Sequence, residues 1–482
     1  TPFFHVIMPA LCSIFNQNDP FEQLQNIQLE LATTADDLQA LVSQLLENSD
    51  EDIIYNFYLN EQMINKPIGD IIYGLGLTLE QEIKITAIPQ EKINVSALSR
   101  CSSDLPGHED AVLTVQFSPN SRFLASGSGD MTIRIWDCYS ACCKQILRGH
   151  NAWVLCLKFS QNGLRLVSAD YEGAVCLWNM ENFTLMNRQL TRSKQKQWVT
   201  CVEWDWSGEY FYTGAKDGCV KCYDKNGNFV RMVGNSTKAI TSICSTGRHL
   251  IAGSEDCAVY IWKLRTWEFV GQVKHAHWVN SVQAQCQFLI RYGIFGVARL
   301  FNFYSSQLTE FGAKSGSQLL QLEKDVQQKV VQKLLLQETE VIISASDDHT
   351  MKLIQIYPTV KVLEQMAGHV RQINQACFSP NQMFVASCSY DRTVRIWSAQ
   401  GKFLMKFQAH ASEVYQVMFS SDSRLILSCS KDSTNKIYSL KQQKLLRELP
   451  GHADEVYAVD WSLDGEYGAS GSKDRLVKLW RQ

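Results

Sequence analysis

The sequence predicts a mainly β protein in which an eight-bladed β-propeller follows a small α+β domain. Three observations support this prediction. A His and an acidic residue recur 22 positions apart, from His108 and Asp130 to His452 and Asp474. Eight such units follow one another, most of them 39 to 45 residues apart. The first 90 residues lack the repeat and differ in charge from the rest. A chain that repeats at this period forms an array of similar units.

Each unit contains short runs in which apolar and polar residues alternate, such as AVLTVQF, RFLASGS and TIRIW, separated by polar turns. This period-two pattern predicts a four-stranded meander, and a sheet of that size buries both faces only when several stack radially. The repeat length is typical of WD40 propellers. An aromatic residue ends a strand six positions after the acid in most units. We expect the buried His, acid and Trp to satisfy one another's hydrogen bonds.

The residues assigned to this structural network are His108, Asp130, Trp136, His150, Glu172, Trp178, His369, Asp391, Trp397, His410, Asp432, His452, Asp474 and Trp480. Units three and four have lost the His, and Gln195 and Asn235 stand in its place. Unit five is stretched by an insertion assigned to residues 303–340. Ser317–Gln337 contains no Gly or Pro and carries an apolar stripe, which predicts a helix. That helix either packs on the propeller or docks a partner.

Residues 1–91 are expected to form the α+β domain. Residues 1–90 contain two basic and thirteen acidic residues, a net charge of −11, so that the rest of the chain carries +8. Strands are predicted near Phe3–Cys12, Ile27–Leu31, Ile53–Leu59 and Glu82–Ile88. Thr34 and Asp37 form a capping box before an amphipathic helix. This order resembles the ubiquitin-like β-grasp fold.

Residues 92–482 are expected to form the propeller. The last unit ends at Trp480 without an outer strand of its own. The run KINVSALSR, residues 92–100, is predicted to supply that strand and to close the ring, which would leave no open sheet edge.

The residues that open each blade should share one rim with the turns before the repeat acids. Trp153, Trp198 and Trp278 come from the first set, and Tyr171, Lys216, Tyr390, Lys431 and Lys473 from the second. Exposed aromatic and basic side chains favour an interface with protein or RNA. Alternatively, the Trp side chains pack between blades.

No catalytic constellation or phosphate-binding loop stands out, so the sequence does not indicate an enzyme. No run is long and apolar enough to span a membrane, and no signal peptide is visible. The sixteen Cys are scattered and indicate a reducing compartment. We expect no intrinsic cofactor and no small-molecule substrate.

Residues 99–130, 275–282 (HAHWVNSV) and 449–461 (LPGHADEVYAVDW) closely resemble the Notchless family of large-ribosomal-subunit assembly factors. The eight units, the insertion in unit five and the β-grasp head resemble it too. The resemblance implies that the propeller docks on the pre-60S particle, with its ribosomal RNA, ribosomal proteins and other assembly factors. It also implies that the head is bound by the metal-ion-dependent adhesion site of midasin, an AAA ATPase. The implied location is the nucleus, both nucleolus and nucleoplasm.

In this family a Glu of the head completes the coordination of the Mg²⁺ held by midasin, nine residues before a Pro. The matching residue is Glu80, with Pro89 after the last strand, and Glu82 is the second choice. A hard divalent cation with an open position prefers a carboxylate oxygen, which fits this role. The resemblance implies that the ATP-driven pull of midasin reaches the propeller through residues 89–100. It would remodel the particle and release the factor.

Two other functions remain open. One is a WD40 substrate adaptor in a ubiquitin pathway, which would bind a ligase or proteasome without Mg²⁺. The other is the related ribosome factor that joins a ubiquitin-like head to a seven-bladed ring, which a count of blades separates from this chain.

Overall fold

A computed structural model describes residues 10–16, 23–29, 37–38, 54–59, 62–63, 83–90, 95, 97–190, 198–288, 291–292 and 339–481. The chain divides into two compact units, Thr1–Asn94 and Val95–Gln482. The boundary therefore falls three residues after the one that the sequence suggested. No helix among the described residues is long and apolar enough to cross a membrane.

The described part of the first unit is one mixed sheet with the strand order β2-β1-β5-β3-β4. Its strands are β1 (Ala10–Asn16), β2 (Gln23–Leu29), β3 (Ile54–Leu59), β4 (Gln62–Met63) and β5 (Ile83–Gln90). Strands β1 and β5 are parallel, and β1 pairs antiparallel with β2. This is the strand order of a β-grasp fold. The first strand was predicted near Phe3–Cys12 but lies later, because the hairpin flanks the polar run of residues 17–20. Of the predicted helix, only Asp37 and Leu38 are described, and both are helical.

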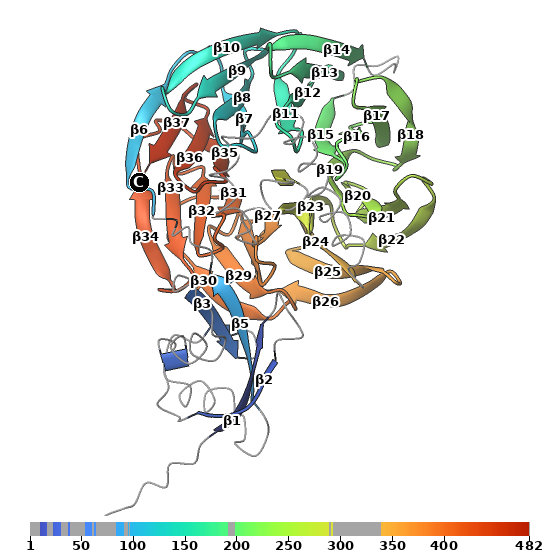
Figure 1. Cartoon of the computed structure of the whole chain (residues 1–482). Helices are drawn as coiled ribbons and strands as arrows, with labels where there is room; N and C mark the ends of the chain where they lie inside the picture. The colour runs from blue at the N-terminus through green and yellow to red at the C-terminus, as the bar shows by residue number, and fades with distance from the viewer. Residues whose placement is uncertain are drawn as a thin grey trace, which may run out of the picture. The chain divides into compact units, whose positions relative to one another are not determined.

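In the second unit the described residues form eight four-stranded sheets arranged as the blades of a ring (Figure 1). The first four blades are β7 to β10 (Val112–Phe117, Phe123–Ser128, Thr132–Asp137, Cys142–Arg148), β11 to β14 (Val154–Phe159, Arg165–Asp170, Ala174–Asn179, Thr184–Leu190), β15 to β18 (Val199–Trp204, Tyr210–Ala215, Cys219–Asp224, Phe229–Asn235) and β19 to β22 (Ile240–Ser245, His249–Ser254, Ala258–Lys263, Phe269–Lys274).

The other four blades are β23 to β26 (Val279–Ala284, Glu340–Ser346, Thr350–Tyr357, Lys361–Ala367), β27 to β30 (Ile373–Phe378, Phe384–Ser389, Val394–Ser398, Phe403–Phe407), β31 to β34 (Val414–Phe419, Leu425–Ser430, Asn435–Ser439, Lys444–Leu449) and β35 to β37 with β6 (Val456–Trp461, Tyr467–Ser472, Val477–Arg481, Arg100–Leu105). The predicted insertion was drawn to residue 340, but Glu340 already belongs to β24; residues 303–338 lie outside the described residues.

The ring closes through β6, which comes from the start of the second unit and pairs antiparallel with β37 (blue beside red in Figure 1). The closing strand was predicted at 92–100, and this is wrong in position, because the strand begins at Arg100. Val95 and Leu98 are instead buried in an apolar cluster with Trp461. The spacing of three between these two residues does not fit the period of two that a strand requires.

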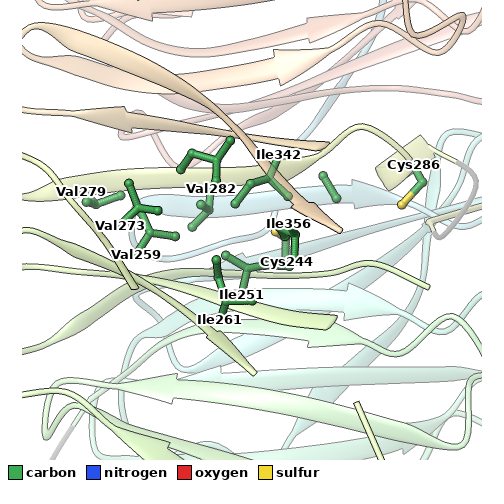
Figure 2. Packing of buried hydrophobic residues seen from close by; sticks show 12 residues of the cluster. Cys244, Ile251, Val259, Ile261, Val273, Val279, Val282, Cys286, Ile342 and Ile356 are labelled. Atoms are coloured by element: carbon green, nitrogen blue, oxygen red, sulfur yellow. The ribbon is translucent and has the colours of Figure 1, made fainter. Parts of the chain in front are cut away.

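The core lies between neighbouring blades. Figure 2 shows the cluster between the fourth and fifth blades, where Ile251 and Ile261 pack with Val282 and Ile342. Each blade thus buries both faces of its sheet against its neighbours, which a single meander could not do. The resulting ring holds the loops at the two ends of its blades in fixed positions.

Candidate interaction surfaces of the propeller

A hydrogen-bonded network inside the blades holds the turns that form one face of the ring. In six of the described blades a buried His contacts a carboxylate through Nδ1 at 2.7–3.1 Å and a Ser hydroxyl through Nε2 at 2.7–2.8 Å. The His residues are His108, His150, His275, His369, His410 and His452, and their Ser partners are Ser126, Ser168, Ser344, Ser387, Ser428 and Ser470.

The indole N–H of Trp136, Trp178, Trp397 and Trp480 donates to the same Ser hydroxyls at 2.8–3.0 Å. The Ser is therefore the centre of the network, and it was not predicted from the sequence. In five of the six units it stands 18 residues after the His, a constant spacing that could have revealed it. In the blades of these Trp residues the indole N–H and Nε2 of the imidazole thus meet at one Ser hydroxyl, while Nδ1 faces the carboxylate.

The network shifts the pKa of its members. Burial opposes ionisation of Asp474, but the hydrogen bonds from His452 and from the amide of Ala453 outweigh it and lower the pKa to about 2. The pKa of Asp130 and Asp391 is lowered for the same reasons. Burial also lowers the pKa of His369. In the sixth blade the two shifts together favour a carboxylate at Asp391 beside a neutral imidazole at His369.

The structure corrects two assignments. His150 contacts Asp170, not Glu172, because Asp170 ends its strand opposite Val154, at the place that Ser128 holds in the first blade. In the fourth blade the position of the His is held by Ser236 rather than Asn235, since Ser236 is buried and stands four residues before β19, as His108 stands four residues before β7. Gln195 lies outside the described residues.

One face of the ring is formed by two sets of residues: those that open each inner strand, and those in the turn after each second strand. We call it the front face. Backbone hydrogen bonds join the two sets. The amides of Tyr171 and Lys216 donate to the carbonyls of Trp153 and Trp198. The amides of Tyr390, Lys431 and Lys473 donate likewise to Gln372, Glu413 and Glu455, and that of Asp347 donates to Trp278. All eight residues proposed as a partner surface therefore lie on one face.

Four of these residues form a continuous stack over the second and third blades, which we call the aromatic ladder: Trp153, Tyr171, Trp198 and Lys216. Ring centroids are 5.7 Å apart for Trp153 and Tyr171 and 4.4 Å apart for Tyr171 and Trp198. Lys216 Nζ lies 3.6 Å from the centroid of Trp198. Trp153 is 51% exposed and Tyr171 39%. The ladder is therefore open to a partner rather than packed between blades.

The remaining residues of the set lie elsewhere on the front face. Trp278 is 42% exposed and contacts His277, with ring centroids 5.5 Å apart. Tyr390 contacts Tyr415 of the seventh blade at 6.1 Å. Lys431 and Lys473 pair with Glu413 and Asp454 at 3.9 and 3.5 Å. The front face thus has two different parts. The aromatic ladder covers the second and third blades, and the part around Tyr390, Lys431 and Lys473 combines aromatic and charged residues.

A short helical segment after β23 bonds to the third and eighth blades. Gln287–Phe288 and Arg291–Tyr292 are helical and follow β23. A short olive-yellow helical piece lies inside the ring in Figure 1. Arg291 pairs with Asp460, and Gln287 donates to Glu203 at 2.9 Å. The hydroxyl of Tyr292 lies 3.3 Å from the carbonyl of Trp461. We call residues 287–288 and 291–292 the channel plug, since they tie the fifth blade to the third and eighth.

The proposed Mg²⁺ ligands of the head, Glu80 and Glu82, lie outside the described residues. Within the part of the chain that the structure describes, no group of three or more His, Cys, Asp or Glu side chains could hold a metal ion.

Comparison with known proteins places this architecture in a family. A profile described as "WD domain, G-beta repeat" matches residues 99–137, 141–179, 187–224, 227–263, 360–398, 401–439 and 443–481, and "NLE (NUC135) domain" matches residues 11–72. The computationally designed Ika8 protein superposes with a TM-score of 0.59 over 79% of this chain and 98% of its own, at 22% identity, which supports the fold alone.

Three relatives match about three quarters of the chain. Protein Notchless of Drosophila melanogaster is 34% identical over 74% of this chain and 72% of its own. The Notchless protein homolog of Arabidopsis thaliana is 35% identical over 77% of this chain and 76% of its own. Ribosome assembly protein 4 of Saccharomyces cerevisiae is 30% identical over 77% of this chain and 74% of its own. Because these identities extend over about three quarters of each protein, the chain belongs to the Notchless family.

Proposed function

We propose that this protein is a non-enzymatic assembly factor of the pre-60S ribosomal particle. The observation that carries the proposal is its similarity, over about three quarters of the chain, to a protein named ribosome assembly protein 4. The propeller docks on the particle, and the β-grasp head binds the adhesion site of midasin. The factor acts in the nucleolus and nucleoplasm.

The front face supports a docking role for the propeller. The aromatic ladder exposes large rings on a rigid scaffold, and aromatic residues are enriched at protein interfaces and at sites that stack bases. Its partners there are ribosomal RNA or proteins of the particle.

The chemistry of the head supports the contact with midasin. Residues 1–90 carry a net charge of −11, and Glu80 precedes the last strand of the sheet. A carboxylate from this acidic unit completes the coordination of Mg²⁺ held by midasin. The pull of the ATPase then enters the propeller through the chain that leads to β6, remodels the particle and releases the factor.

The test is binding of the full chain to the midasin adhesion-site domain, with Mg²⁺ and with EDTA. We expect Mg²⁺-dependent binding that Glu80→Ala weakens at least about a hundredfold, since a lost metal ligand costs several kcal/mol. Glu82→Ala is the matched control, with the same charge change two residues away. Loss with Glu82→Ala alone would move the ligand to Glu82, and binding that survives EDTA would overturn the metal contact.

Two alternatives are distinguished by observations. The eight four-stranded sheets described for the propeller argue against the related seven-bladed ribosome factor. A ubiquitin-pathway adaptor would bind a ligase or the proteasome and would not need Mg²⁺, so a wild-type chain that fails to bind midasin would favour it.

A further inference from the structure

Three tyrosines from three successive blades gather on the front face, away from the aromatic ladder. Tyr390 comes from a turn of the sixth blade, and Tyr415 and Tyr457 are the second residues of β31 and β35. Ring centroids are 6.1 Å apart for Tyr390 and Tyr415 and 5.8 Å apart for Tyr415 and Tyr457. All three are partly exposed. We call these residues the tyrosine patch.

Two of these tyrosines occupy a position that has another use in four other blades. Thr200, Thr241, Asn280 and Asn374 stand at the equivalent place and donate to a backbone carbonyl of the next blade. Tyr415 instead donates its hydroxyl to Glu455 at 2.9 Å. The seventh blade therefore keeps a bond to the next blade, but makes it from a tyrosine hydroxyl to a side-chain carboxylate, and so presents an aromatic ring beside an acid. Departures of this kind from a structural pattern are expected at functional sites.

The rings lie in a negative field. Burial and the carboxylates of Asp347, Glu413 and Glu455 raise the pKa of Tyr390. Lys431 and Lys473 are the basic groups paired here, and each bridges to an acid at 3.5 Å or more with its own side chain 45–49% exposed. Exposed pairs of this kind contribute little to stability, so an incoming cation can compete with them.

We propose that the tyrosine patch recognises an arginine side chain of a partner protein. A guanidinium group stacks on aromatic faces and forms paired hydrogen bonds with a carboxylate, and a patch of tyrosines beside Glu413 and Glu455 supplies both. A lysine ammonium binds there less well, because it is more strongly hydrated and lacks the planar fork. RNA is disfavoured, since its phosphates would meet the same carboxylates. The inference goes beyond the proposed function and does not depend on it.

The test is selection of random 12-residue peptides displayed on phage against the immobilised full chain, followed by affinity measurement of the selected peptides. We expect arginine to be enriched over lysine in these peptides. Replacing the arginines by citrulline, which is neutral and of similar shape, should weaken binding about tenfold or more, as the loss of a charge-assisted pair implies. Glu455→Gln and Tyr457→Leu should cause a similar loss.

Glu255→Gln is the matched control, because Glu255 lies on the same face in the fourth blade and its amide donates to Ala239 as that of Lys473 does to Glu455. This variant should bind the peptides as the wild type does. Melting temperatures of all variants show whether the ring is intact, and Glu455→Gln keeps the test valid if Tyr457→Leu misfolds. The proposal is overturned if arginine is not enriched or if Glu255→Gln causes the same loss of peptide binding. It is also overturned if poly(U) competes with the peptides and its binding is weakened by the same substitutions.

Discussion

The Oδ2 atom of Asp170 lies 2.8 Å from Nδ1 of His150 and takes the place that the repeat spacing assigned to Glu172. Asp170 also accepts hydrogen bonds from the amides of Glu172 and Ala174 at 3.0 and 2.8 Å. One fully buried carboxylate therefore satisfies the imidazole and orders the turn that presents Tyr171 on the front face.

Asp170→Ala should lower the stability of the propeller by about 2–4 kcal/mol, because it leaves a buried imidazole and two amides without their acceptor. Glu172→Ala removes the acid that the repeat spacing singled out and should cost less than about 1 kcal/mol. Thermal unfolding followed by circular dichroism compares the two. Equal losses would mean that the network depends on Glu172 after all.

Removing β6 should destabilise the ring. A chain that starts at residue 106 lacks the fourth strand of the last blade and exposes the edge of β37. We expect a lower melting temperature and aggregation. A chain that starts at residue 95 keeps Val95, Leu98 and β6 and serves as the control. If both truncated chains melt as the full chain does, β6 does not close the ring in solution.

Breaking the pair between Arg291 and Asp460 should be costly. Asp460 is 2% exposed and also accepts the amide of Phe117 at 2.7 Å, so that Arg291→Met leaves a charge buried beside the channel. We expect the free energy of unfolding to fall by about 3 kcal/mol. Adding Asp460→Asn in a double variant should restore part of this loss. Lys225→Met, which breaks the exposed pair with Glu209, should cost about 0–1 kcal/mol.

Unfolding midpoints from denaturant titration provide the comparison. An Arg291→Met variant no less stable than Lys225→Met would show that the channel plug does not hold the third and eighth blades to the fifth.

Acid should weaken the propeller in two steps. The lowered pKa of His369 means that the unfolded chain binds a proton more readily, so stability falls once the pH drops below about 6.5. The pKa of Asp474 is about 2 in the folded protein and about 4 when unfolded, so its contribution is present above pH 4 and is lost toward pH 2. Melting temperature measured across pH 2–8 tests both losses of stability. Asp474→Asn should make the loss between pH 4 and pH 2 smaller. A melting temperature that rises on acidification would contradict the assignment.

Trp153→Ala and Tyr171→Ala should weaken binding to pre-60S particles about tenfold or more, as expected for exposed aromatic anchors. They should leave the melting temperature nearly unchanged, because both side chains are more than a third exposed. Tyr139→Ala is the control, since Tyr139 is 87% exposed but lies in a turn between the third and fourth strands of its blade. Co-sedimentation with purified particles measures the effect, and equal binding by all variants would remove the ladder from the docking surface.

Periodic patterns in the sequence were enough to predict the blades and their number. The His, the acid and the strand-ending aromatic residue recur at local spacings, and alternation within each strand predicts which side chains are buried. The placement of Trp153, Tyr171, Trp198 and Lys216 on one face also followed from repeat position alone. What repeats did not predict was that these four residues touch, because the contact joins two neighbouring blades.

The sequence by itself determined the repeat, the two-part organisation and the closure of the ring by a segment from before the first repeat. The tertiary structure decided which residues close it, which acid meets His150 and which blades Gln287 and Arg291 join. Strand β6 begins at Arg100 because Val95 and Leu98 are buried in the seam beside Trp461, and Arg291 meets Asp460 across 169 positions of the chain. Such contacts carry no local period, since they arise only when the ring brings distant segments together, and a one-dimensional pattern cannot report them.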